Sequence, residues 1–351
     1  MPLPESLLPV PTSAPPVEPP QLSADELDAL VELAASALAP NTRRTYRTAF
    51  AQFASWCDEH APPLQALPAH PLTVAAYLRS RAAGGVKRGT LMIDLAAIGK
   101  MHQNARQTSP THDVTLREVL RGLKREISRP PRQAPPILTE DLRKLSSAQE
   151  VPPRGTALAR ERAGARDRAI LLLGFAGAFR RSEIADIRIR DLALDDATGA
   201  TGGMTVYLPH SKTDQEGEGA LVEIPRGSIE TTCPVRAILH WLDVLALAQG
   251  VAEDHPLFQR IDRWGNFRSP APLDGGSISR IVKRAADDAD LGERGFSGHS
   301  LRAGLATSAA MSGAGIEEIM AQTRHKSVTV AMTYIRLRRR GALNVAARVG
   351  L

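Results

Sequence analysis

Apolar side chains recur at helical spacing through the first third of the chain. Residues 23–38 place an Asp and a Glu just after Ser23, which is expected to cap a helix, and then repeat Leu and Val every three or four residues. Asn41 or Thr42 is expected to cap a second helix that continues to about residue 60. This part of the chain is therefore predicted to be all-helical. Its further helices are expected at 71–81, 90–103 and 115–128.

The period of the pattern changes in the second half of the chain. Thr139 is expected to cap a helix, and the apolar run at 164–177 predicts a buried one. Residues 204–209 and 220–225 flank the polar turn HSKTDQEGEG and predict two short strands. Helices are expected to resume at Thr232 and to continue nearly to the C-terminus. The second part is therefore predicted to be mostly helical with a small antiparallel β-sheet.

Proline marks the expected boundaries within this mainly α fold. Residues 1–20 contain eight prolines and almost no periodic pattern, so they are interpreted as a disordered tail. Residues 130–136 contain four more prolines and predict a stiff linker. Two domains are expected on either side of this linker, at 21–129 and 137–351.

Composition narrows the classes of partner. The chain has 351 residues, a formal net charge of +6 and a pI near 9.6, which favours nucleic acid first and acidic lipid second. A mildly basic surface without such a partner is an equally good interpretation. Cys57 and Cys233 lie far apart, which argues against a disulfide framework or a metal motif. No apolar run reaches the length of a membrane span and no signal-peptide pattern is present, so a soluble cytoplasmic protein is expected.

Basic residues form a stripe along the helix expected at 115–128. They recur at four-residue steps and so fall on one helical face, while the Glu residues of the segment fall off it. A solvated face is the usual meaning of such a stripe, but the lack of neutralising acids favours contact with phosphate. The stripe comprises Arg117, Arg121, Arg125 and Arg129, with Lys124 close to it.

Two segments near the C-terminus, SGHSLRAG and TRHKSVTVAMTYIR, carry the most informative polar pattern. His299 and Arg302 are three residues apart and so share a helical face, and His325 is followed nine residues later by Tyr334. Tyr is scarce, with four in the whole chain, so one among basic residues is a candidate nucleophile. Each signal alone has a commoner interpretation, a satisfied His beside an Arg or a packed Tyr.

Further signals lie upstream. Arg180 and Glu183 are three residues apart in GAFRRSEIADI, which alone indicates a salt bridge at a helix start, and Lys212 lies in the turn between the expected strands. Taken in order, Arg–x–x–Glu, Lys, His–x–x–Arg, His and Tyr resemble the pattern of the tyrosine recombinases, the phage integrase family. The resemblance extends over nearly the full chain and is strongest to the Cre-like members of the family.

The resemblance implies an architecture and partners. Residues 21–129 would be a SAM-like core-binding domain that clamps DNA, and 137–351 a catalytic domain with a C-terminal tail helix. The tail would dock on a neighbouring protomer, although its Arg residues are equally well interpreted as a phosphate patch. The implied partners are double-stranded DNA with an inverted-repeat target site, further copies of the chain in a tetramer on synapsed DNA, and accessory DNA-bending proteins. The gene would be bacterial, or encoded by a phage or plasmid.

The resemblance also implies roles for the residues that carry it. Tyr334 would attack a DNA phosphodiester, leaving a 3′-phosphotyrosine and a free 5′-hydroxyl. Arg180 and Arg302 would hold the non-bridging oxygens, and Lys212 would protonate the departing 5′-oxygen. His299 would act as general acid and base.

The remaining positions include one departure from the family pattern. His325 would hydrogen-bond the phosphate, and Glu183 would orient its neighbours. Many members have Gly immediately before the second His, where this chain has Arg324, and the bulkier residue is expected to change the loop or to add a phosphate contact. The candidates for DNA contact are Arg43, Arg44, Arg47, Lys87, Arg88, Arg117, Arg121, Lys124, Arg125 and Arg324.

The chemistry of this set does not call for a cofactor. Two guanidiniums can stabilise the charge of a phosphorane-like transition state, a phenol needs a base, and the leaving alkoxide needs a proton donor. No metal, ATP or other cofactor is expected. The same residues would also suit a type IB topoisomerase or a telomere resolvase. A catalytically silent DNA-binding accessory protein is a further alternative, but it would be expected to lose at least one of the seven positions.

Overall fold

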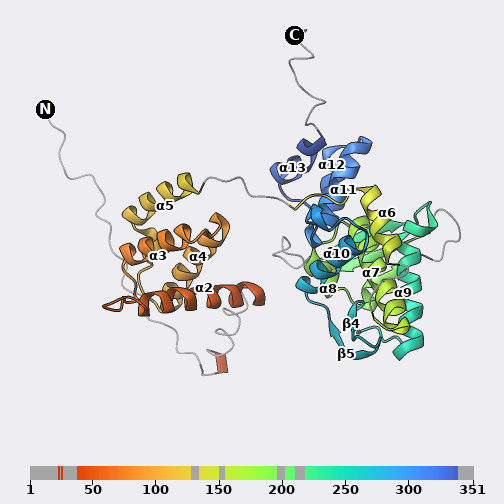
Figure 1. The fold of residues 1–351 in the computed structure, drawn as a ribbon, viewed down its shortest axis with the longest axis horizontal. Helices are drawn as coiled ribbons and strands as arrows, with labels where there is room; N and C mark the ends of the chain where they lie inside the picture. The colour runs from red at the N-terminus through yellow and green to blue at the C-terminus, as the bar shows by residue number, and fades with distance from the viewer. Residues whose placement is uncertain are drawn as a thin grey trace, which may run out of the picture. The chain divides into compact units, whose positions relative to one another are not determined.

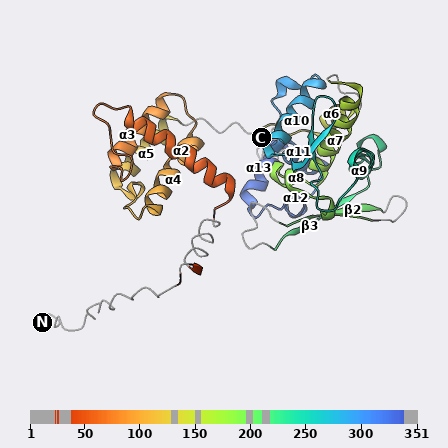
Figure 2. The ribbon, with the colours of Figure 1, turned by 90° about the horizontal axis from the view of Figure 1, so that it is seen from below.

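The chain divides into two compact units, Met1–Pro131 and Arg132–Leu351 (Figures 1 and 2). The computed structural model describes residues 23, 25–26, 38–127, 134–149, 155–195, 202–209 and 218–338, without the side chains of 268, 269 and 335–338. The predicted tail, most of the helix expected at 23–38, most of the expected linker, Lys212 and the residues after 338 lie outside this range.

The first unit is built from helices around an aromatic and aliphatic core. Phe53 and Tyr77 are almost fully buried and meet edge to face, with their ring centroids 5.1 Å apart. No strand occurs among the residues of this unit that the structure describes, so the all-helical prediction is confirmed for them. The helices are α2 (Pro40–Asp58), α3 (Pro71–Ala83), α4 (Arg88–Asn104) and α5 (Val114–Glu126).

The first helix start departs from the prediction. Helix α2 begins at Pro40 after Ala39 and has no side-chain cap, so the expectation that Asn41 or Thr42 caps it is wrong. Proline suits this first position because it lacks the N–H that would go unpaired there and its φ is already helical. Helix α3 uses the same device at Pro71, with the His70 side chain accepting a hydrogen bond from the Leu72 N–H.

The second unit is mostly helical with a small antiparallel sheet, which confirms the fold prediction, and it also has a two-stranded ladder that was not expected. One sheet has the order β1–β2–β3, and Tyr207 of β2 pairs with Leu221 of β3. The elements are α6 (Thr139–Ala148), α7 (Ala157–Ala176), α8 (Arg181–Asp186), β1 (Leu192–Leu194), β2 (Gly203–Leu208), β3 (Ala220–Pro225), α9 (Pro234–Gln249), β4 (Gln259–Ile261), β5 (Phe267–Pro272), α10 (Gly275–Asp288), α11 (Gly298–Ser312), α12 (Ile316–Thr323) and α13 (Val328–Arg338).

Three local predictions for this unit need correction. Thr139 is the first residue of α6 and not its cap, because the Asp141 carboxylate accepts from the Leu138 N–H at 3.1 Å and closes the helix start one residue earlier. Helix α7 begins at Ala157, well before the expected residue 164, with Thr156 as its cap. The expected helical run after Thr232 is interrupted by the β4–β5 ladder, and α9 itself begins at Pro234.

Helix α11 packs against α6, α7, α10, α12 and α13 of the second unit (Figure 1). Its close approach to the segment before α6 depends on Gly304, where a Cβ would lie 1.9 Å from the Ile137 carbonyl oxygen. The Ile137 N–H in turn donates to the Ser300 carbonyl at 3.0 Å. This packing fixes the start of α11, which carries two of the residues singled out by the sequence.

Among the described residues, no helix combines the length and the apolar character that a bilayer crossing requires.

Candidate active site

Helix α11 presents Arg302 and His299 from its first two turns. The Arg302 side chain is 1% exposed, and its Nη1 donates to the Ala178 carbonyl at 2.8 Å. Its Nη2 is buried and has no hydrogen-bond partner among the described residues. Burial and the repulsion of Arg180 lower the pKa of Arg302 to about 10, which still leaves it charged at neutral pH. Arg302 therefore has an unused donor for an anion.

Arg180 and Glu183 are held together at the start of α8. The Arg180 Nη1 donates to Glu183 Oε1 at 2.5 Å, and the Arg180 backbone N–H donates to Oε2 at 2.9 Å. Burial acts to raise the pKa of Glu183, but these hydrogen bonds and the nearby Arg324 outweigh it and hold the pKa below its usual value. The carboxylate is thus ionised and fixes the orientation of the Arg180 guanidinium.

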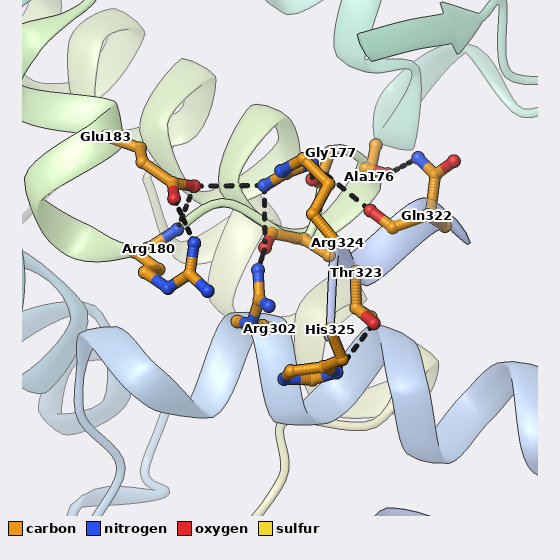
Figure 3. A network of polar contacts seen from close by, with 10 residues as sticks. Ala176, Gly177, Arg180, Glu183, Arg302, Gln322, Thr323, Arg324 and His325 are labelled. Carbon is orange, nitrogen blue, oxygen red and sulfur yellow. Dashed lines mark hydrogen bonds and ion pairs between the residues drawn. The ribbon is translucent and has the colours of Figure 1, made fainter. Parts of the chain in front are cut away.

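The turn between α12 and α13 brings a third guanidinium into the network (Figure 3). Arg324 Nη2 donates to Glu183 Oε2 at 2.9 Å, and Arg324 Nη1 donates to the Gly177 carbonyl at 3.0 Å. The next residue, His325, has its Nδ1 2.7 Å from the Thr323 hydroxyl. The Glu183 carboxylate therefore lies between two arginines, and Arg324 directly precedes the histidine in the chain.

Tyr334 of α13 lies against both histidines. Its hydroxyl is 3.1 Å from His299 Nε2, and its ring stacks on His325 with centroids 5.6 Å apart. The side chain is 7% exposed and packs with alanines of α11 such as Ala303 and Ala306. Burial raises the pKa of Tyr334, although Arg302 and Arg180 act in the opposite direction. The phenol is therefore protonated at rest, with an imidazole nitrogen at hydrogen-bonding distance.

Both histidines are kept neutral. Burial, followed by the charges of Arg302 and Arg180, lowers the pKa of His325 to about 4. The same causes, in the same order, lower the pKa of His299. Neutral imidazoles can accept a proton, and the surrounding guanidiniums provide a strongly positive field. This arrangement can bind a phosphate and deprotonate a hydroxyl beside it.

The structure thus brings together six of the seven residues singled out by the sequence, while Lys212 lies outside the described range. The basic residues proposed for DNA contact in the first unit are exposed, apart from the half-buried Lys124. Arg324 instead turns inward onto Glu183 and three backbone carbonyls.

Sequence reasoning missed two parts of the site, the Thr323 hydroxyl and the Ala178 carbonyl. Ala178 has a φ of 47° and follows Gly177, where a Cβ would lie 2.2 Å from the Phe179 ring. The Gly-Ala pair before Arg180 was a sign of a tight turn there, but no residue pattern could indicate which carbonyl faces Arg302.

Comparisons with known proteins agree with the geometry. Residues 147–340 match the model of the phage integrase family. The chain is 35% identical over 300 residues to an integrase/recombinase xerD homolog of Selenomonas ruminantium, covering 85% of this chain and 82% of that protein. It is 26% identical to the recombinase cre of Escherichia phage P1, covering 81% and 80%.

Solved structures with the same fold include DNA complexes. A lambda integrase tetramer bound to a Holliday junction aligns with a TM-score of 0.56 at 17% identity, covering 92% of this chain and 80% of that one. A XerH site-specific recombinase bound to a palindromic difH substrate aligns with a TM-score of 0.53 at 16% identity, covering 76% and 69%. The chain belongs to the phage integrase family, the tyrosine recombinases, whose members cleave and rejoin DNA in site-specific recombination.

Proposed function

We propose that this chain recombines DNA at a specific site through a covalent Tyr334–DNA intermediate. The observation that carries the proposal is the 3.1 Å contact between the Tyr334 hydroxyl and His299 Nε2, beside the unused Nη2 donor of Arg302. A nucleophile, a base and an anion-binding group are thus adjacent, as an attack on phosphorus requires.

In the first step the Tyr334 oxygen bonds to the phosphorus as its proton passes to His299. The bond from phosphorus to the 5′-oxygen breaks, which leaves a 3′-phosphotyrosine and a free 5′-hydroxyl once that oxygen has gained a proton. Lys212 is the proposed donor of that proton. Reversal of the step with another strand's 5′-hydroxyl rejoins the DNA, so the bond energy is conserved and no ATP is consumed.

Charge at the phosphate is balanced by the two arginines. Arg302 offers its buried Nη2, and Glu183 holds the Arg180 guanidinium beside it. Guanidiniums placed in advance around a water-poor site stabilise the charge of the five-coordinate transition state more than they would in water. Because a bound phosphate anion favours the protonated imidazole, His325 is proposed to take up a proton from solvent on Nε2 when DNA binds and to donate a hydrogen bond to that phosphate from its place on the Tyr334 ring.

The proposed partner is a duplex with inverted repeats, bound by a tetramer of the chain. Support comes from the neighbours, since the lambda integrase structure is a tetramer on a Holliday junction and the XerH substrate is palindromic. The exposed arginines of α2 and α5 are proposed to contact its phosphates. Accessory DNA-bending proteins and a cytoplasmic location stay predictions.

Covalent trapping tests the proposal. A duplex is first selected from a random-sequence pool by its binding to Tyr334→Phe, which cannot cleave. Versions with a nick at successive central positions are then incubated with the parent protein and run on a denaturing gel. The parent is expected to give an SDS-resistant adduct on at least one of them, and Tyr334→Phe none.

Tyr207→Phe is the matched control, because Tyr207 lies exposed on β2 and should leave adduct formation at the parental level. If the parent binds the selected duplex but forms no adduct at any nick position, the proposal is wrong. Joining of two such duplexes would support a recombinase, whereas relaxation of a supercoiled circle without exchange would indicate the topoisomerase alternative.

A further inference from the structure

Arg324 occupies a backbone position that favours glycine. It ends α12 with φ 54° and ψ 44°, in the left-handed region that costs an L-residue with a Cβ about 1 kcal/mol or more. The backbone therefore gives no reason for an arginine at this position. The reason must lie in what its side chain contacts.

The Nη donors of the Arg324 guanidinium are used within the protein. Nη1 donates to the carbonyls of Gly177 and Gln322, at 3.0 and 3.1 Å. Nη2 donates to Glu183 at 2.9 Å and approaches the Ala178 carbonyl at 3.4 Å. The remaining N–H, on Nε, is buried without a partner among the described residues. No Nη hydrogen is left over for a DNA phosphate.

Two of the four acceptors of Arg324 also accept from the two phosphate-binding arginines (Figure 3). Glu183 receives both Arg324 and Arg180, and the Ala178 carbonyl receives both Arg324 and Arg302. The Arg324 guanidinium also lies over the Phe179 ring, 5.1 Å from its centroid, in the same turn. Arg324 therefore contacts the group that orients Arg180 and the group that orients Arg302.

We infer that Arg324 is a positioning residue, which fixes Glu183 and the 177–179 turn and thereby aims Arg180 and Arg302 at the scissile phosphate. With Arg324 the site has three guanidiniums and one carboxylate. Glu183 can therefore orient Arg180 while the net charge of the site stays positive. The inference rests on the proposed function, and it assigns Arg324 no direct contact with DNA.

Arg324→Gly separates positioning from phosphate contact. Glycine suits the left-handed backbone, so the side chain is removed without straining the turn. The cleavage rate of bound DNA is expected to fall by up to about 100-fold, because a misplacement of about 1 Å around a reacting centre can cost that much. The affinity for the selected duplex and its salt dependence are expected to stay parental. Loss of a phosphate contact would instead reduce the slope of log Kd against log salt by about 1.

Two further variants keep the test decisive if the glycine variant folds poorly. Arg324→Lys retains the charge but cannot span Glu183 and the carbonyls together, so it is also expected to cleave slowly. Lys326→Ala removes a charge from an exposed position of the same turn and should cleave bound DNA at the parental rate. Added guanidinium ion should restore Arg324→Gly several-fold and leave Lys326→Ala unchanged.

A double variant tests the route through Glu183. If Arg324 acts through that carboxylate, Arg324→Gly combined with Glu183→Gln should lose less rate than the product of the two single losses. The inference is overturned if Arg324→Gly cleaves bound DNA at the parental rate, or if its main effect is weaker binding with a smaller salt slope. Absence of any Tyr334 adduct in the parent would instead overturn the proposed function itself.

Discussion

His299 Nε2 lies 3.1 Å from the Tyr334 hydroxyl, although the two residues are 35 positions apart in the chain. The contact joins the second residue of α11 to the middle of α13, two helices that pack against each other. An imidazole can accept the phenol's proton at this distance only while it is neutral. The protonation state of His299 therefore determines how the cleavage rate falls at acid pH.

A pH profile of cleavage follows from this contact. The pKa of His299 is held below its usual 6.5, chiefly by burial, so the free protein loses the neutral base only below that pH. The second-order rate constant for adduct formation should thus rise with pH and level off by about pH 6.5. Single-turnover assays check this. The rise of the rate constant with pH should appear in the parent and be absent from His299→Gln. His240→Gln, on the exposed side of α9, should keep it.

The tautomer of His325 is a second expected outcome. The Thr323 hydroxyl donates to the Ile319 carbonyl at 2.6 Å, so it can only accept from His325, whose Nδ1 must carry a proton. With its pKa lowered to about 4, His325 should be neutral at pH 7 in the DNA-free protein, with Nε2 unprotonated. Nitrogen NMR of selectively labelled protein checks both statements.

Thr323→Val should remove the preference for a proton on His325 Nδ1 and slow cleavage about 10-fold, because the imidazole would lose the contact that orients it. Thr323→Ser keeps the hydroxyl and should retain both the tautomer and the rate. A parental spectrum with the proton on Nε2 would contradict the assignment.

Local patterns predicted much of this fold because they act over short distances. The i, i+3 spacing of His299 and Arg302 put both on α11, and alternation placed β2 and β3. The β4–β5 ladder was missed because β4 has only three residues and β5 contains Pro270 in its interior, so neither has a run of alternating apolar residues. Local patterns of this kind favoured a continuous series of helices.

The role of Arg324 could not be predicted in the same way. The sequence shows an arginine where many family members have glycine. A long basic side chain there is equally compatible with a DNA contact and with a contact inside the protein. The choice depends on Glu183, 141 residues away, and on the Ala178 carbonyl, which has no side-chain signature. Only tertiary packing brings these acceptors to the end of α12.

Removal of divalent metal should leave adduct formation unchanged. The positive charge at the site is supplied by Arg180, Arg302 and Arg324, which a chelator cannot remove. Adduct yield on the nicked duplex in excess EDTA is expected to stay within about twofold of the yield in magnesium. A loss that added magnesium restores would show that the guanidiniums do not suffice.

Gly304→Ala should destabilise the second unit. The new Cβ would lie 1.9 Å from the Ile137 carbonyl oxygen and 3.1 Å from the Phe175 ring, so α11 would have to move. Overpacking of this kind costs about 1–3 kcal/mol or more. Gly122→Ala is the matched helical control, since its Cβ would meet nothing within 4 Å and should stabilise by about 0.5–1 kcal/mol. Thermal unfolding compares the two, and equal midpoints would contradict the close approach.

Glu183→Gln should change how stability depends on pH. The folded pKa of Glu183 lies below the ordinary value of 4.5, because hydrogen bonds from Arg180 and the charge of Arg324 outweigh burial. The unfolded chain therefore binds this proton first as the pH falls, and the stabilisation, complete above about pH 4.5, is lost through the lower folded value. Denaturant titrations from pH 3 to 7 should show a shallower pH dependence in Glu183→Gln. Its stability at pH 7 should be lower by about 3 kcal/mol, because two partly buried guanidiniums lose their counter-charge. An unchanged slope would mean that Glu183 is not ionised between the two arginines.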